Sequence, residues 1–291
     1  MITKPRGTPA AAPGEIGQPK VRAMRDPHGT SFAPAPAHHR TVRRNAVLFE
    51  VALATVAYFS YFLVRGLTES GFDRATVNAE RVIRFEKWLG LYHEDAVQDA
   101  IANHDWLVNL ANWVYIWGHW PVIITVGAWL LWSCPREYRT LRNGFLISGA
   151  IGLVVFATFP VAPPRLLDLG LIDTVTDRSM AYRILQPPAF VNQYAAMPSL
   201  HFGWDLLVGI ELVRRADKVY VRAIGVLLPL LMGWAVVATA NHFIIDGLIG
   251  GVLALFGLGV ATLAARQLDG AQDRIQSFAA RALTINPRAE A

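Results

Sequence analysis

The chain has 291 residues, of which 53% are hydrophobic and only 17% charged, whereas a soluble domain carries about 25% charged residues. The apolar residues come in blocks of near membrane-spanning length, so the sequence predicts an all-α, polytopic membrane protein. The single cysteine, Cys134, excludes an intramolecular disulfide and a cysteine-based metal cluster, and the net charge of +5 reflects arginines in loops between apolar blocks rather than a nucleic-acid site.

The N-terminal part combines a polar tail, one span and a surface segment. Residues 1–40 are rich in Pro, Ala and Gly and contain no apolar run, so they are expected to be disordered. The first span is predicted over residues 45–64. A polar segment follows over 65–106, with an amphipathic stretch over 82–102 that is expected to lie along the membrane surface as one or two helices.

The middle of the chain predicts two more spans. The second covers residues 107–132, is dense in tryptophan, and contains Tyr115 and His119 four residues apart. A tight loop over 133–143 carries three arginines. The third span then covers residues 144–161, which is close to membrane-spanning length.

A loop of about 36 residues, 162–197, separates the third span from the fourth. Loops this long are uncommon unless they serve a function. The last three spans are predicted over 198–213, 219–240 and 243–265, and the first of these is short for a membrane at about 16 residues. A polar tail closes the chain.

Six spans place both tails on one side of the membrane, together with the loops 133–143 and 214–222. These segments carry most of the densely packed arginines, so the positive-inside rule makes that side cytoplasmic. The expected organisation is a cytoplasmic tail over 1–40, a six-helix catalytic domain over 41–266 in the cell membrane, and a cytoplasmic tail over 267–291. The long polar segments then face the extracytoplasmic side.

Two histidines each stand four residues before an aspartate, His201 before Asp205 and His242 before Asp246. On a helix this spacing places both side chains on one face, one turn apart. Each pair lies where an apolar helix begins or ends, and polar groups there are costly enough to suggest a function. The predicted topology brings both pairs and Arg165 to the extracytoplasmic face.

These residue types suit the chemistry of phosphate. His242 with Asp246 resembles a base or nucleophile with its orienting carboxylate. His201 supplies a second imidazole, which is suited to protonating a leaving group. Arg165 offers a planar fork that matches phosphate oxygens.

The start of the fourth span adds an anion site. Pro198 suits the first turn of a helix, and the free amides of Ser199, Leu200 and His201 would then point at a bound anion. Ser199 also offers a hydroxyl. A carboxylic ester is disfavoured as substrate because no Ser-His-Asp order with a nucleophile elbow is visible.

Residues 198–201 (Pro-Ser-Leu-His), followed about forty residues later by His242-x3-Asp246, resemble the type 2 phosphatidic acid phosphatase superfamily. In that family the motifs Lys-x6-Arg-Pro, Pro-Ser-Gly-His and Ser-Arg-x5-His-x3-Asp build the site. Leucine in the third place of the second motif, and Asn-His-Phe over 241–243, make the chain more similar to the inositol phosphorylceramide synthase branch. The resemblance covers roughly residues 45–265.

The resemblance implies a role for each matching residue. His242 would be the nucleophile that forms a phosphohistidine, Asp246 its orienting partner and His201 the general acid. Ser199 would contact phosphate, and Arg165 would match the arginine of the first motif. The resemblance also implies a site without metal or cofactor, although two His and two Asp are chemically able to bind a divalent ion.

The chain departs from the family pattern in its first and third motifs, and no proline follows Arg165. Thr158 stands where the first motif has its lysine, and Val236 stands where the third motif has its phosphate-binding arginine. Arg84, Arg178 and Arg183 are candidates to replace that arginine.

Three further residues have open roles. Asp205 either braces the histidine one turn before it or caps a polar cluster. His119 and Tyr115 either line the substrate pocket or form an interhelical hydrogen bond.

The sequence therefore predicts an integral membrane enzyme that acts on a phospholipid or lipid phosphate, without a nucleic-acid partner. The phosphohistidine would pass to water in a phosphatase, or to an alcohol in a phosphotransferase that moves a headgroup such as inositol phosphate between lipids. The alternative in the same class is a polyprenyl- or phosphatidate-type lipid phosphate phosphatase. A non-catalytic lipid-binding protein or a transporter is the alternative of another class, although a transporter would line a path with ionisable groups.

Overall fold

The computed structural model describes residues 37–68, 71–178 and 192–285. The chain divides into two compact units at Ala52. Of the first unit, the described part is the beginning of one helix, and the second unit contains all the other elements. Residues 1–36 of the predicted disordered tail lie outside the described part.

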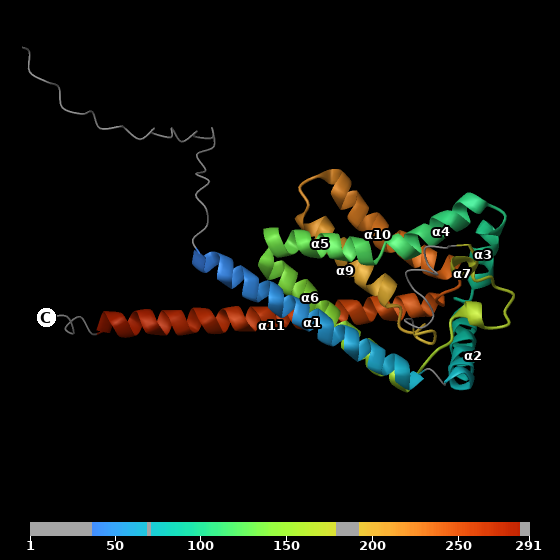
Figure 1. The fold of residues 1–291 in the computed structure, drawn as a ribbon, viewed down its shortest axis with the longest axis horizontal. Coiled ribbons are helices and arrows are strands. Elements are labelled where there is room, and N and C mark those ends of the chain that lie inside the picture. Colours follow the sequence, from blue (N-terminus) through green and yellow to red (C-terminus); the bar gives the residue numbers. More distant parts are fainter. Residues whose placement is uncertain (1–36, 69–70, 179–191, 286–291) are drawn as a thin grey trace, which may run out of the picture. The chain divides into compact units, whose positions relative to one another are not determined.

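The described residues form helices, with no strand among them, which confirms the all-α prediction. In chain order the elements are α1 (Ala37–Thr68), α2 (Phe72–Leu89), α3 (Glu94–Ala102), α4 (Asp105–Trp117), α5 (Trp120–Ser133), α6 (Pro135–Thr158), the 3-10 turn η1 (Pro164–Leu166), α7 (Thr174–Arg178), α9 (Leu200–Arg215), α10 (Val219–Ala238) and α11 (Ile244–Ile285) (Figure 1). The last helix runs on through most of the predicted C-terminal tail.

Four of the described helices are long and apolar enough to cross a membrane, namely α6, α10, Val47–Gly66 in α1 and Ile244–Ala271 in α11. Helices α4 and α5 make a fifth candidate if they are one span bent by 43°. The chain is thus a multi-pass membrane protein with four or five candidate spans, where the sequence predicted six.

The difference lies in α9. Its 16 residues rise about 24 Å at 1.5 Å per residue, which is less than the roughly 30 Å of hydrocarbon in a bilayer. Figure 1 shows α9 among the longer helices of the second unit, where it contacts both α10 and α11.

Glycines let the start of α9 approach α11 closely. A Cβ on Gly203 would meet the carbonyl oxygen of Gly250 at 2.4 Å, and a Cβ on Gly250 would meet the carbonyl oxygen of Ser199 at 2.1 Å. Small residues at such crossings allow backbone-to-backbone contact between membrane helices. The backbone that carries the second motif therefore rests directly on the helix that carries Asp246.

The predicted amphipathic stretch over 82–102 forms two helices, the end of α2 and then α3, separated at Gly90 with φ of +70°. One face of α2 joins a core cluster made by Ala75, Ala79, Val82, Ile83, Val161, Ala162, Ala196, Phe243 and Ile245. The opposite face exposes Phe85 and Trp88, whose rings stack 5.8 Å apart. Helix α2 therefore packs against the segments that carry the motifs.

Candidate active site

Backbone hydrogen bonds bring the three motif segments together. After α6, the Val161 N–H donates to the carbonyl of Tyr194 at 2.9 Å, and the Ala196 N–H donates to the carbonyl of Val161 at 3.2 Å. The Arg165 N–H donates to the carbonyl of Ala240 at 2.9 Å. The two ends of the long loop and the turn after α10 are therefore neighbours.

His242 lies in the tight turn between α10 and α11. Ala240 has φ of +55°, the left-handed conformation that commonly ends a helix. The amides of Asn241 and His242 both donate to the carbonyl of Val236, each at 3.0 Å. These bonds fix the backbone of His242 against the last turn of α10.

A backbone carbonyl holds the His242 ring. Its Nδ1 lies 2.7 Å from the carbonyl oxygen of Ala196 and 3.7 Å from Oδ2 of Asp246. Because a carbonyl oxygen only accepts, Nδ1 carries the hydrogen and Nε2 keeps its lone pair. Ala196 thus provides the orienting contact that the sequence analysis gave to Asp246, and no sequence pattern marks such a backbone group.

Asp246 is fully buried in the first turn of α11. Its Oδ2 accepts the Phe243 N–H at 2.8 Å, so the carboxylate caps the start of the helix. A negative charge is also favoured at this end of the helix dipole. Asp246 Oδ2 therefore bonds to the backbone at the start of its own helix and lies 3.7 Å from Nδ1 of His242, beyond hydrogen-bond distance.

The helix α9 begins later than the sequence predicted. Ser199 is its N-cap, with Oγ accepting the Phe202 N–H at 3.5 Å, and the Ser199 N–H donates to the carbonyl of Asp246 at 2.9 Å. Pro198 therefore precedes the helix, and the Ser199 amide is not free for an anion, contrary to the prediction. The first amides of α9 itself still lack intrahelical acceptors, as at every helix start.

Three aromatic rings surround that of His201. The ring centroid of His201 lies 5.9 Å from that of His242, 4.4 Å from that of His119 and 4.9 Å from that of Tyr115. The structure thus brings the two motif histidines together and adds the two candidate residues of the second predicted span.

Asp205 pairs with His119 rather than with His201. Its Oδ1 lies 2.8 Å from Nδ1 of His119, and both side chains are buried. His119 stands at the break between α4 and α5, so the pair is an interhelical hydrogen bond to α9. An interhelical hydrogen bond is one of the two roles predicted for His119. The His119–Asp205 pair is a second His–Asp pair, and its imidazole packs against the ring of His201.

Arg165 is anchored beside the turn that carries His242. Its Nε donates to Oδ1 of Asn241 at 2.9 Å, and its Nη1 donates to Oδ2 of Asp173 at 3.0 Å. Asn241 directly precedes His242, and the Arg165 side chain is only 10% exposed. The fork of Arg165 is therefore held in one orientation close to His242.

Val236 is buried in an apolar cluster with residues of α4. This position is therefore not one from which a side chain could bind phosphate. Of the candidate replacements, Arg178 pairs with Asp105, and Arg84 is exposed and faces Glu80 on its own helix. Arg183 lies outside the described residues. Neither described contact involves a residue of the motifs.

Two buried carboxyl groups beside the site were not predicted. Oε1 of Glu86 accepts the Ile245 N–H at 2.7 Å, and Oε1 of Glu94 accepts the Ile244 N–H at 2.9 Å. Glu86 stands four residues after Val82 on the buried face of α2, so helical periodicity was a signal that could have found it. Within the described part of the chain, no group of three or more His, Cys, Asp or Glu side chains is arranged to hold a metal ion.

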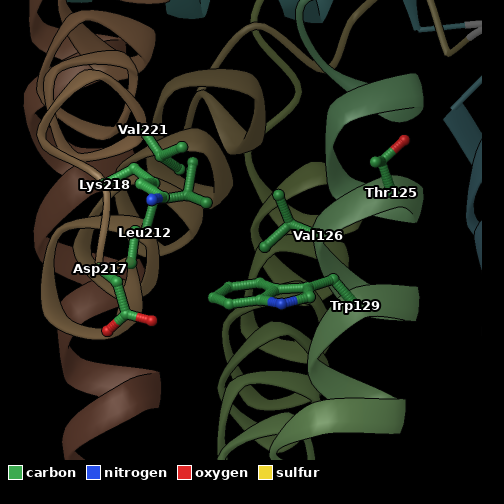
Figure 2. A pocket seen from close by; sticks show the side chains of 8 residues that line it. Thr125, Val126, Trp129, Leu212, Asp217, Lys218 and Val221 are labelled. Carbon is green, nitrogen blue, oxygen red and sulfur yellow. The ribbon is translucent and has the colours of Figure 1, made fainter. Parts of the chain in front are cut away.

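A pocket of about 350 Å³ lies at the other end of α9 and is separate from these histidines (Figure 2). It is lined by Thr125, Val126, Trp129, Leu212, Ala216, Asp217, Lys218 and Val221. Figure 2 shows the Trp129 indole extending from α5 toward Leu212. Since Leu212 follows Ser199 by more than three helical turns, roughly 20 Å, this pocket does not contain the motif residues.

Comparison with known proteins assigns the chain to a superfamily. The model of the PAP2 superfamily matches residues 80–260, more than half of the sequence, so the chain belongs to the PAP2 superfamily. Among solved structures, the crystal structure of Aquifex aeolicus LpxE is similar at 16% identity with a TM-score of 0.44, over 60% of this chain and 93% of that one. No curated protein matches the sequence. With its apolar helices, the chain is a multi-pass membrane protein of this superfamily.

Proposed function

We propose that the chain acts on lipid phosphates through a phosphohistidine formed on His242, as a phosphatase or a phosphotransferase. The observation that carries this proposal is the 2.7 Å contact of His242 Nδ1 with the Ala196 carbonyl, which leaves Nε2 as the nucleophile. His201, with its ring 5.9 Å from that of His242, is assigned the role of general acid.

The reaction then runs in two displacements. Nε2 of His242 attacks phosphorus in line, the bond from phosphorus to the leaving oxygen breaks, and that oxygen takes a proton from protonated His201. Water or an alcohol next attacks the phosphohistidine and gives its proton to His201 while the N–P bond breaks. The products are the released alcohol and either inorganic phosphate or a new phosphodiester or phosphomonoester.

Charge develops on the equatorial phosphate oxygens, and positioned donors are what phosphoryl transfer requires. Arg165 is assigned to these oxygens, because Asn241 and Asp173 hold its guanidinium beside the nucleophile. The first amides of α9 and the Ser199 hydroxyl are assigned to the same phosphate, the hydroxyl on condition that it leaves its weak 3.5 Å capping contact.

The substrate-binding wall around His201 is assigned to Tyr115, His119 and Asp205. Tyr115 stacks on His201 at 22°, and the buried His119–Asp205 pair packs against the same ring. These contacts support a role in holding His201 and the bound lipid phosphate in place.

The acceptor divides the proposal into hydrolysis and transfer. Leucine in the second motif and the Asn-His-Phe sequence over 241–243 resemble the inositol phosphorylceramide synthase branch, so we favour transfer of an inositol-phosphate-like headgroup. A phosphatidate- or polyprenyl-type phosphatase is the version in which water is the acceptor.

The proposed topology keeps six spans in the cell membrane, with the 16-residue α9 as the short one. Its contacts with α10 and α11 support a place inside the bundle, where a short helix can begin below the surface. Both tails are then cytoplasmic and the histidines extracytoplasmic.

The test uses the purified full-length chain with a panel of labelled phospholipids, with and without inositol and with EDTA. Wild type is expected to turn over at least one lipid phosphate, and His242→Ala to lose this activity, while the exposed His93→Ala serves as control. A labelled inositol product identifies a transferase. Absence of turnover in the wild type contradicts the enzyme and favours a lipid-binding protein, and loss of turnover in EDTA contradicts a metal-independent site.

A further inference from the structure

Three carboxyl groups meet at the start of α11. The amides of Phe243, Ile244 and Ile245 are three successive donors, and each donates to a different carboxyl oxygen. The first acceptor is Asp246 itself, while Glu94 and Glu86 come from α3 and α2. These bonds tie the two surface helices to the turn that holds His242.

The second oxygens of the two glutamates have no donor. Glu86 and Glu94 are both 0% exposed, and their Oε2 atoms are buried without a hydrogen-bond partner among the described residues. The nearby cations of α2 are engaged elsewhere, Lys87 over the ring of Tyr92 and Arg84 toward Glu80. If both carboxylates were ionised, each would have one amide donor, and the two negative charges would repel each other.

We propose that Glu86 and Glu94 share one proton through their free oxygens, and that this carboxyl pair positions the His242 turn. The inference rests on the proposed function, because it assigns the pair to the same nucleophile. In the shared state one proton supplies the missing donor, and the pair carries a single negative charge, which the start of a helix favours. Loss of that proton places a second negative charge beside Asp246 and pushes the three carboxyl groups apart.

The electrostatics of the pair agree with this geometry. Burial raises the pKa of Glu86 to about 8, the Ile245 amide opposes the rise, and the charge of Glu94 adds to it. The groups that face the pair are Asp246 from α11 and Tyr92 from the connection between α2 and α3, with His242 behind Asp246. The proton is therefore lost near pH 8, within a working range for an enzyme.

The first test is the pH profile of kcat/KM on the lipid phosphate found above. Wild type is expected to lose activity as the pH rises through about 8. Glu86→Gln stays neutral and offers an amide donor to Glu94, so it is expected to lack the loss of activity near pH 8, while the pH dependence set by His201 as general acid remains. Glu86→Ala leaves the Ile245 amide without an acceptor and is expected to be at least tenfold less active than Glu86→Gln. The exposed Glu80→Gln on the same helix is the control and keeps the wild-type profile.

The second test does not depend on activity. A carboxyl whose pKa is raised on folding destabilises the fold as the pH climbs from about 4.5, its unfolded value, to about 8. The unfolding temperature of the wild type in detergent is expected to fall by about 3 °C per pH unit over this window and then to level off. Glu86→Gln is expected to flatten this slope.

Outcomes of the two tests separate the two proposals. If no lipid phosphate is turned over but the unfolding slope disappears in Glu86→Gln, the proposed function fails and the shared proton stands. If Glu86→Gln keeps both the loss of activity near pH 8 and the unfolding slope of the wild type, the shared proton is wrong. Equal activity of Glu86→Ala and Glu86→Gln contradicts the positioning role.

Discussion

Among single residues, the group that holds the His242 ring decides which ring nitrogen can act as the nucleophile. A backbone carbonyl at 2.7 Å from Nδ1 sets the tautomer, and Asp246 lies 3.7 Å from the same atom and caps α11. This arrangement differs from a Ser-His-Asp triad, where the aspartate itself fixes the tautomer of the histidine. In such a triad, replacement of the aspartate by asparagine lowers kcat by about 10⁴-fold.

Asp246→Asn is therefore expected to be milder than in such a triad. Asparagine still accepts the Phe243 N–H through its amide oxygen, and the Ala196 carbonyl still holds Nδ1. We expect kcat to fall by about tenfold to a hundredfold, well short of the loss in a triad. Asp246→Ala removes the cap as well and is expected to lower the unfolding temperature. A loss in Asp246→Asn as large as in His242→Ala would show that Asp246, and not Ala196, sets the tautomer.

The His119–Asp205 pair yields a second prediction at this scale. Both side chains are buried and 2.8 Å apart, so each loses its partner when the other is removed. A double-mutant cycle of His119→Ala and Asp205→Ala is expected to give a coupling of about 1–3 kcal/mol in unfolding free energy. The same cycle on kcat reports whether the pair also holds His201. Additive effects in both readouts would contradict a working pair.

At the scale of elements, the site depends on the contact between the start of α9 and the first turns of α11. The contact places the Ser199 backbone on Gly250, and the Ser199 N–H on the carbonyl of Asp246. The second and third motifs therefore keep their relative position through main-chain contact, which side-chain substitution elsewhere leaves intact.

Gly250→Ala tests this contact, with Gly259→Ala of the same helix as the matched control. The added Cβ at 250 would meet the carbonyl oxygen of Ser199 at 2.1 Å, whereas at 259 nothing lies within 4 Å. Overpacking of this kind costs about 1–3 kcal/mol, so Gly250→Ala is expected to unfold several degrees lower and to lose at least tenfold in kcat. Gly259→Ala should be as active and as stable as wild type. Similar behaviour of both variants would contradict the close contact.

Helix periodicity and apolar length predicted most elements, but not their ends or their partners. The amphipathic stretch of 82–102 was found, while the buried Glu86 within it was not linked to the site, because the amide that donates to its carboxylate, that of Ile245, lies 159 residues away. The start of α9 was placed at Pro198 from proline's preference for a first turn, and Ser199 is the cap instead. The pairing of Asp205 with His119 could not be predicted, because it depends on the packing of α9 against the break between α4 and α5. Local sequence patterns carry no information about that packing.

For the molecule as a whole, the sequence predicted a multi-pass membrane protein and its superfamily. The apolar helices confirm the first prediction, and the superfamily match over residues 80–260 confirms the second. The prediction of six spans depended on α9. This helix begins with polar residues, and its 16 residues are fewer than an ordinary span contains. The convergence of His201, His242 and Arg165 was predicted from the expected topology, in which each stands at an end of a span on the same side. The short distance between the two histidine rings and the bond of Arg165 to Asn241 agree with that convergence.

Labelling of single cysteines tests the proposed topology. In a Cys134→Ser background, Asp168→Cys reports the loop after η1 and Asp217→Cys the loop between α9 and α10; both positions are exposed. An impermeant thiol reagent is expected to label Asp168→Cys in intact cells and Asp217→Cys only after permeabilisation. The reverse pattern would place the histidines on the cytoplasmic face.

A covalent phosphohistidine on His242 can be trapped on the protein. Purified protein is incubated briefly with a lipid phosphate labelled at phosphorus, denatured in alkali, and assayed for label that remains on the protein but is released by acid. We expect such acid-labile label on wild type and on the control His93→Ala, and none on His242→Ala. Label of equal amount on His242→Ala, or turnover by wild type without any label on the protein, would contradict the account.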